Sequence, residues 1–245
     1  SCRKEIHNVK KIKLVGEGEY GCIYKVDCNG KIYACKLFHV DFDSYSTKGQ
    51  IKILKVIDSY LSFNFPSVLH LYELGYFNLV GEKEFGIITE YCEHGYLENC
   101  FKELNNTQKL INFIGIAAGL NYLNELHIIH RDISLSSIVL DEHYYPRICN
   151  VMFKNVFTDL EKIAKVISTS IFTAPETFEK NEYTTKSEVY GFGMLVYILL
   201  TGNLPYQGLN GYKRMLKIIN DETPELTDDI KPCYQELIKS CWEHD

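Results

Sequence analysis

The sequence predicts an α+β fold in two parts, a small antiparallel sheet with one helix followed by a larger helical part. Apolar residues alternate with polar ones up to about Cys92, and from Tyr96 onward they recur with helical spacing. The chain has 245 residues, of which 46% are apolar, enough for a substantial core. We therefore expect one domain over 1–245, with an N-lobe at 1–91 and a C-lobe at 92–245.

Five stretches of the N-lobe have the alternation of strands. They are Lys11–Gly16, Cys22–Asp27, Lys31–Phe38, Val68–Phe77 and Glu84–Tyr91. The dipeptide Asn29-Gly30 predicts a tight hairpin between the second and third strands. After the third strand, Gly49–Tyr60 predicts the one helix of this lobe, because apolar residues recur there at helical spacing. These residues are Ile51, Leu54, Ile57 and the following Leu61.

Four further stretches predict the helices of the C-lobe. They are Leu110–Leu126, Val189–Leu200, Tyr212–Asn220 and Pro232–Trp242. In the first, one apolar side is expected, formed by Leu110, Phe113, Ile114, Ala117, Leu120 and Leu123. The second is apolar nearly all round, which is typical of a helix buried in a core. The segment 150–175 has weak periodicity, and loops of that length inside compact domains are usually functional.

Composition excludes several classes of function. The formal net charge of −6 makes a nucleic-acid partner a poor hypothesis. The longest apolar run, Met194–Leu200, is too short to span a bilayer, and Ser1–Glu5 does not lead into a signal peptide. We expect no membrane span.

Nine cysteines are scattered without the spacing of a zinc site. Free thiols in a reducing, cytoplasmic compartment are therefore expected. Cys22, Cys35 and Cys149 each lie beside a motif discussed below, so we expect them near one pocket, where packing is the simpler role.

A glycine-rich turn joins the first two predicted strands, with glycines at Gly16, Gly18 and Gly21. Such a turn lets backbone N–H groups approach phosphates closely, although the same pattern also occurs in ordinary hairpins. Here Ala34 and Lys36 follow on the next strand and no helix follows the glycines. This combination favours a phosphate-binding turn of the kinase type over a Rossmann turn.

Further motifs appear in the order and spacing of a kinase. They are His130-Arg131-Asp132, Ala174-Pro175-Glu176, and Ser187–Gly193 with Glu188 where aspartate is usual. From about Val9 to Trp242 the chain resembles the eukaryotic protein kinases, which implies their bilobal fold. The stretch from Pro224 through Trp242 is most similar to the tyrosine-kinase-like group. In that family the chain continues beyond the position of Asp245, so we expect the natural protein to continue too, with this C-lobe cut before its last helix.

The resemblance implies a set of site residues. Those implied to bind ATP are Gly16, Gly18, Gly21, Ile23, Ala34, Lys36, Glu90, Cys92 and Val139. Thr89 takes the gatekeeper position and Asp132 that of the catalytic base. In active relatives the arginine at the position of Arg131 binds a phosphorylated residue through charge-assisted hydrogen bonds. The candidates for that residue here are Ser168, Thr169, Ser170 and Thr173. The alternative is that these are only solvated hydroxyl groups of a loop.

The departures from the family bear on catalysis. Gln50 stands where a glutamate pairs with the lysine, and Ser134 replaces a catalytic-loop lysine. Ser137 replaces the amide, and Asn150 the carboxylate, that hold magnesium. Met152 removes the glycine of the same motif. ATP binding therefore remains possible, whereas magnesium binding is not expected at this site. Asp132 is not expected to act as a productive catalytic base.

These features predict a pseudokinase, which binds ATP weakly without metal and acts as an allosteric or scaffolding domain. Its partner would be a protein, such as an active kinase or another signalling protein. A slow serine/threonine kinase that uses Asp132 is one alternative. A structural interaction module that binds no nucleotide is the other.

Overall fold

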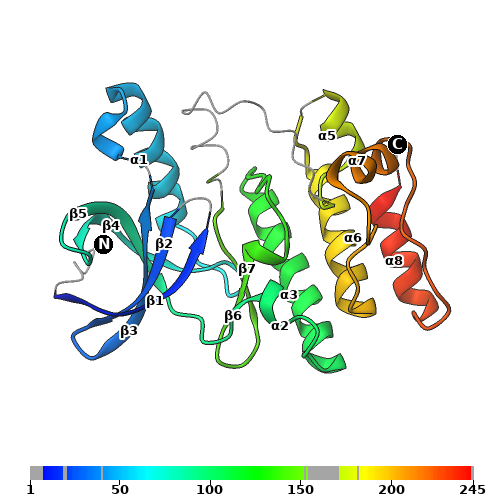
Figure 1. The fold of residues 1–245 in the computed structure, drawn as a ribbon, viewed down its shortest axis with the longest axis horizontal. Coiled ribbons are helices and arrows are strands. Elements are labelled where there is room, and N and C mark those ends of the chain that lie inside the picture. The colour runs from blue at the N-terminus through cyan, green and yellow to red at the C-terminus, as the bar shows by residue number, and fades with distance from the viewer. Residues whose placement is uncertain are drawn as a thin grey trace. The chain divides into compact units, whose positions relative to one another are not determined.

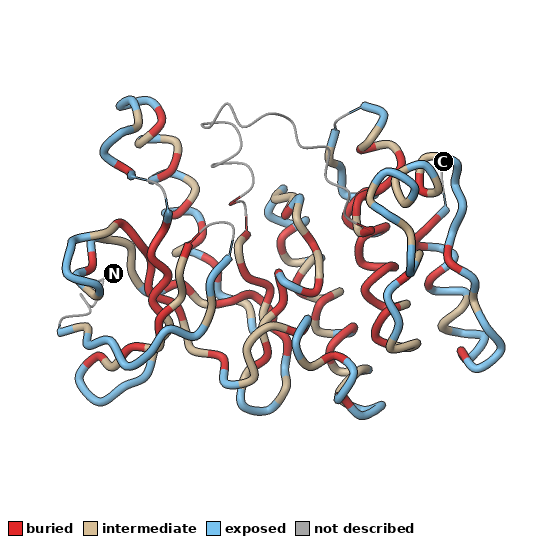
Figure 2. Tube along the Cα trace, viewed as in Figure 1, coloured by how far each residue is buried: buried red, intermediate tan, exposed pale blue. Residues whose placement is uncertain are grey.

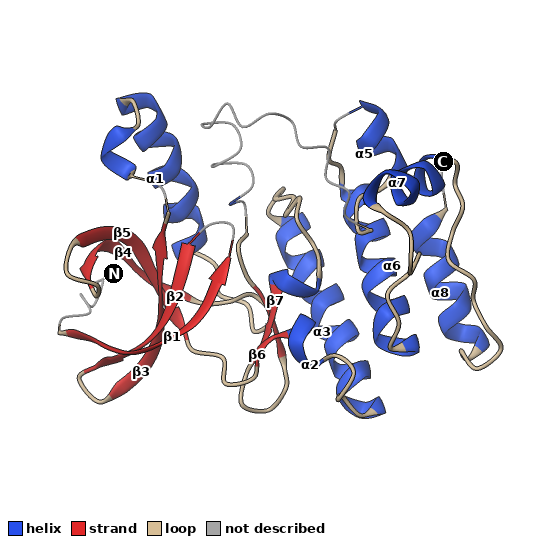
Figure 3. Ribbon diagram, in the orientation of Figure 1, coloured by secondary structure: helices blue, strands red, loops and turns tan. Residues whose placement is uncertain are grey.

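The computed structural model describes residues 8–18, 21–39, 41–151, 153, 171–180 and 182–243. The chain forms two compact units, Ser1–Glu93 and His94–Asp245. The boundary predicted from the sequence lies two residues earlier, after Tyr91. Strands dominate the first unit and helices the second (Figure 3), so the predicted α+β fold is confirmed.

The first unit is built on a five-stranded antiparallel sheet of order β1-β2-β3-β5-β4 (Figure 1). Its strands are β1 (Val9–Gly18), β2 (Gly21–Cys28), β3 (Lys31–Phe38), β4 (Leu71–Asn78) and β5 (Lys83–Glu90). The predicted β2–β3 hairpin is present, with φ of 58° at Asn29 and 82° at Gly30. The Gly30 N–H donates to Asp27 Oδ1 at 3.0 Å, which fixes the turn.

The helix of the first unit is α1 (Thr47–Leu61), preceded by the short 3-10 helix η1 (Phe42–Ser44). The side chain of Ser46 accepts a hydrogen bond from Gly49 N and caps the helix. Its buried residues are Gly49, Ile53, Ile57 and Tyr60. The predicted stripe shares only Ile57 with this face, and Ile51 and Leu54 are 47% and 42% exposed. The helical period is thus right but its phase is wrong.

The second unit contains the helices and a small sheet of order β6-β7-β8. The helices are α2 (Leu97–Cys100), α3 (Asn106–Glu125), η2 (Leu135–Ser137), α5 (Pro175–Lys180), α6 (Thr185–Thr201), α7 (Gly211–Ile219) and α8 (Pro232–Trp242). The strands are β6 (Gly95–Tyr96), β7 (Ile138–Leu140) and β8 (Pro146–Ile148). In the described residues, no helix combines the length and apolar character that a membrane crossing needs.

Helix α6 is the central element of this core, as its apolar sequence predicts. It is buried along most of its length (Figure 2), although Val189 is 41% exposed. Helix α8 packs against α6 at Gly193, where an added Cβ would lie 2.6 Å from Cys241 Cβ. Helix α6 is capped at its C-terminus by Gly202, whose φ of 70° suits a glycine C-cap.

The apolar side predicted for α3 is partly wrong. Phe113 and Leu123 are buried, but Leu110 and Ile114 are 37% and 56% exposed. The fully buried Asn112 takes a core position instead, donating to the carbonyls of Gln108 at 2.8 Å and Tyr144 at 3.0 Å. A hydrogen-bonded polar residue can occupy a core position, and an apolar count of the sequence does not show this.

Candidate functional site

In the first unit, the strand register brings several predicted site residues onto one face of the sheet. Lys36 is paired with Ile23 on β2 and with Ile87 on β5. Ala34 is paired with Thr89 on β5 and lies two residues from Lys36, so it shares that face. Lys36 is only 8% exposed, which is unusual for a lysine. The buried ammonium group of Lys36, with the apolar side chains of Ala34 and Ile23 on the same face, suits a ligand that has both an anionic group and an apolar ring.

The glycine turn differs in what each glycine does. An added Cβ at Gly21 would lie 2.0 Å from the carbonyl oxygen of Leu37, so β2 and β3 can approach only because this residue is glycine. At Gly18 an added Cβ would meet nothing within 4 Å. Gly16, on β1, pairs with Ile23 next to a register shift. Glu19 and Tyr20 of the turn lie outside the described residues.

Gly21→Ala is therefore expected to lower the free energy of unfolding by about 1–3 kcal/mol, because the strands must separate to admit a methyl group. Gly18→Ala is the matched control, with a change below about 0.5 kcal/mol. Urea denaturation of both variants checks this. Equal losses in the two variants would contradict the steric explanation.

Gln50 on α1 makes a hydrogen bond to the segment just before its own helix. Its Nε2 donates to the carbonyl of Phe42 at 3.2 Å. The Phe42 ring in turn stacks on Phe85 with centroids 4.2 Å apart, which connects the start of α1 to β5. The neutral amide thus makes a local structural contact, and it cannot form the ion pair that a glutamate would offer to Lys36.

The end of β5 holds three predicted site residues. The Thr89 hydroxyl donates to the carbonyl of Glu90 at 3.1 Å, and the Glu90 carboxylate accepts from His70 N at 2.7 Å. Glu90 N also donates to His70 O at 3.1 Å, so this backbone is held firmly. Cys92 follows and is 9% exposed. These local hydrogen bonds hold the backbone of residues 89–92 in place, which is what a ligand-binding segment requires.

In the second unit, the loop His130-Arg131-Asp132 is fixed from both sides. The backbone N–H of Asp132 donates to His130 Nδ1 at 3.2 Å, so the ring proton lies on Nε2, which donates to Cys149 O at 2.8 Å. Arg131 has a φ of 69°, and its N–H donates to Glu188 Oε1 at 2.9 Å. This strained turn leaves Asp132 half-buried.

Ser137 does not present a ready metal ligand. It is 2% exposed, and its hydroxyl accepts from Ser134 N at 2.9 Å and donates to Ser134 O at 3.0 Å. The pair forms a capping box for η2, and Ser137 O accepts from Cys149 N at 2.8 Å. Both polar groups of Ser137 therefore hold the loop together.

Asn150 follows the small sheet and is half-buried with a φ of 61°. Its carbonyl accepts from Phe153 N at 3.1 Å, and Val151 between them is fully buried. Val139, the predicted ATP-binding residue that lies in this unit, is on β7 opposite Tyr96 and Arg147 and is half-buried. Position 150 carries a neutral amide, whereas Mg²⁺ usually binds in proteins through one or two carboxylates.

Parts of the predicted segment fall outside the description. Met152 and the candidate phosphorylation residues Ser168, Thr169 and Ser170 lie outside the described residues. Thr173 is described and is only 8% exposed. A buried hydroxyl is poorly placed for modification, which argues against Thr173.

Glu188 has a larger role than the sequence indicated. It is 6% exposed, and burial raises the pKa of its carboxyl to about 7, against the backbone hydrogen bonds of Arg131 and His130, which lower it. A cavity of about 20 Å³ lies beside it, lined also by Arg131, Asp132 and Thr177. The signal in the sequence was a charged residue directly before the apolar run Val189–Leu200.

The expectation that three cysteines lie near one pocket is wrong for Cys22 and Cys35. Strand side chains alternate, so Cys35 faces away from its neighbour Lys36 and joins the buried cluster on the other face of the sheet, with Cys22 packed against it. Burial raises the pKa of the Cys35 thiol well above its usual range. Packing is its role.

Comparison with known proteins identifies the family. A family model described as the protein kinase domain matches residues 9–245. The chain therefore belongs to the protein kinase family, whose members bind ATP and, when active, use magnesium with it.

Individual relatives agree. The chain is 27% identical over 269 residues to a probable serine/threonine-protein kinase of Dictyostelium discoideum, covering 98% of this chain and 29% of that protein. It is 30% identical over 245 residues to a second such protein of the same organism, covering 94% and 25%. It is 28% identical over 244 residues to ephrin type-A receptor 1 of Homo sapiens, covering 95% and 24%. The chain thus spans less than a third of these relatives.

Proposed function

We propose that this domain is a pseudokinase that binds ATP weakly and without a divalent metal. We further propose that it acts as an allosteric or scaffolding domain for a protein partner. The observation that carries the proposal is the state of the two magnesium positions. Asn150 is neutral, and the Ser137 hydroxyl is committed to Ser134 in both directions. Mg²⁺ usually binds through carboxylates as well as substrate phosphates, and these residues supply none.

Nucleotide binding is supported by the sheet face of the first unit. It carries Ile23, Ala34 and the buried Lys36, with a glycine turn at Gly18 that has room for an approaching group. The expected binding residues are those of the sequence prediction. Lys36 would carry much of the charge recognition, since no metal is expected to share the phosphates.

Thermal unfolding with ATP tests the proposal, with magnesium in one arm and a chelator in the other. At tenfold excess over Kd we expect a stabilisation of about 1.4 kcal/mol that is equal in both arms. Lys36→Met should abolish it. Lys31→Met is the matched control, because Lys31 is an exposed lysine at the start of the same strand. Gly18→Ala should weaken the shift while leaving the apo protein unchanged.

A slow serine/threonine kinase is the second candidate. It is favoured by the retained Asp132, by the intact hydrogen bonds around His130, and by the names of the Dictyostelium relatives. A shift that requires magnesium, with labelled phosphate transferred to protein, would establish it in place of the pseudokinase. No shift at all would favour the structural module.

A further inference from the structure

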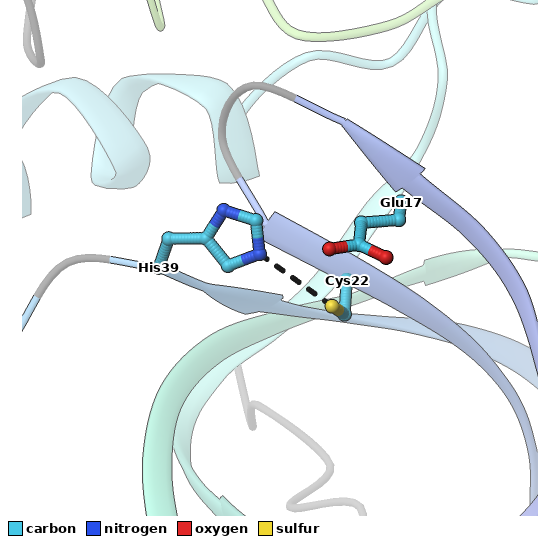
Figure 4. Close-up of side chains that lie close together, drawn as sticks. All are labelled: Glu17, Cys22 and His39. Atoms are coloured by element: carbon cyan, nitrogen blue, oxygen red, sulfur yellow. Dashed lines mark hydrogen bonds between the residues drawn. The ribbon is translucent and has the colours of Figure 1, made fainter.

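Three side chains of types that can bind metals meet on the first unit, outside the residues proposed for ATP. They are Glu17, Cys22 and His39 (Figure 4). One ligand atom from each lies within 4.8 Å of the other two, and Cys22 Sγ and His39 Nε2 are 3.5 Å apart. Glu17 and His39 are exposed and Cys22 is half-buried, so the cluster is open to solvent.

The strand register explains why they meet. Glu17 on β1 lies directly opposite Cys22 on β2, and Cys22 lies opposite Leu37 on β3. His39 is two residues beyond Leu37 and so returns to the same face. Lys36, the neighbour of Leu37, points to the other face. The cluster is therefore built by three neighbouring stretches of one sheet and is separate from the Lys36 face.

We propose that Glu17, Cys22 and His39 bind a divalent metal ion of the zinc class. A thiolate, an imidazole and a carboxylate are the ligands that zinc takes in proteins, and the sulfur disfavours hard ions such as magnesium and calcium. Three protein ligands leave one tetrahedral position for water. On binding, the Cys22 thiol loses its proton to the solvent and the sulfur donates a lone pair to the metal.

The distances fit this geometry. With Zn–S near 2.3 Å and Zn–N near 2.0–2.1 Å, tetrahedral ligands stand about 3.6 Å apart. The Cys22–His39 separation of 3.5 Å already matches. The Glu17 carboxylate, on an exposed side chain, needs a movement of only about 1 Å, since no pair exceeds 4.8 Å.

The charge around Cys22 also favours a cation. Glu17 lies opposite Cys22 in the strand register, and the carboxylate of Glu84 also acts on the Cys22 thiol electrostatically. Glu84, on β5, lies two residues before Gly86, which pairs with Leu37, so it faces the same side of the sheet. Two carboxylates thus act on one thiol from two strands.

Metal binding here would join β1 and β2 next to the glycine turn. Glu17 lies beside Gly18, and Cys22 beside Gly21. A metal held by both, and by His39 after β3, would fix the base of the turn from the face opposite Lys36. The inference is independent of the proposed function, because none of the three side chains is proposed to hold ATP.

Cobalt(II) is the direct probe, on untagged protein purified with a chelator and then freed of it. We expect one cobalt per chain and a thiolate-to-cobalt charge-transfer band, both displaced by zinc. Zinc should also raise the unfolding temperature of the protein in the absence of ATP. No charge-transfer band at saturating cobalt would overturn the proposal.

Matched variants locate the site. Cys22→Ser and His39→Gln should each weaken zinc binding by about 100-fold or more, and Glu17→Gln by about 10-fold. Cys233→Ser and His143→Gln, at an exposed cysteine and an exposed histidine of the second unit, should bind zinc as the unaltered chain does. His39 is exposed, so its variant should keep the apo unfolding temperature even if Cys22→Ser does not. Unchanged zinc affinity in His39→Gln would sink the assignment.

Discussion

Asn150→Asp combined with Ser137→Asn is expected to make ATP binding depend on magnesium and to raise phosphate transfer by about 10²–10³-fold. Without these groups we expect turnover near 10⁻³ s⁻¹ or slower, against roughly 1–100 s⁻¹ for active kinases. A carboxylate at position 150 restores a hard anionic ligand, and an amide at 137 a neutral oxygen ligand. Labelled phosphate transfer to a generic protein substrate, with magnesium varied, is the measurement.

The backbone at position 150 suits this exchange. Asn150 has a φ of 61°, and aspartate is also tolerated in the left-handed region. Ser137 is harder to change, because a larger side chain must fit a position that is 2% exposed and the Ser134 pair is lost. Asn150→Asp alone is therefore measured too, and it should already add a magnesium-dependent part to the thermal stabilisation by ATP.

Asn8→Asp is the matched control for this variant. Asn8 is exposed and also has a φ of 61°, so the substitution makes the same chemical change in the same backbone conformation. It should change neither magnesium dependence nor phosphate transfer. Ordinary kinase turnover by the unaltered chain would refute the pseudokinase proposal, and a restored carboxylate without any magnesium effect would show that position 150 is not the metal position.

The sequence predicted the type and order of the long elements better than the faces they bury. Strands β1 to β3 and their hairpin follow from alternation and from Asn29-Gly30, which are local signals. In α1 the spacing of Ile51 and Leu54 resembles that of the buried Ile53 and Ile57, and only packing decides between them. The short elements β6 and α5 carry too few residues for a periodic signal.

The candidate site divides in the same way. The grouping of Ile23, Ala34 and Lys36 follows from motif spacing and strand alternation. The Glu17–Cys22–His39 cluster does not, because it depends on the register of the β1–β2 turn, in which Gly18 pairs with Gly21 and Glu17 with Cys22. A shift of one residue moves a side chain to the other face, so its neighbours cannot be counted from the sequence.

Glu188→Gln is expected to remove a large pH-dependent loss of stability. The pKa of Glu188 in the folded chain is raised by burial to about 7, from 4.5. The unfolded chain therefore loses this proton at a lower pH than the folded chain, so the contribution is fully present below pH 4.5 and is lost as pH rises to about 7. At 1.36 kcal/mol per pKa unit, the loss between pH 5 and 8 is about 2–3 kcal/mol.

Chemical denaturation of both proteins at several pH values measures this as a difference, in which the other titrating groups cancel. Glutamine keeps a carbonyl that can accept from the Arg131 N–H but does not ionise, so its stability relative to the unaltered chain should rise from pH 5 to 8. Glu236→Gln, at an exposed position on α8, should follow the unaltered chain throughout. Glu188→Ala should be less stable than Glu188→Gln at pH 5 by about 1–3 kcal/mol, because a buried donor loses its acceptor. If the difference between Glu188→Gln and the unaltered chain did not change with pH, the carboxyl would titrate alike in both states, and the hydrogen bonds from Arg131 and His130 would have to offset its burial in full.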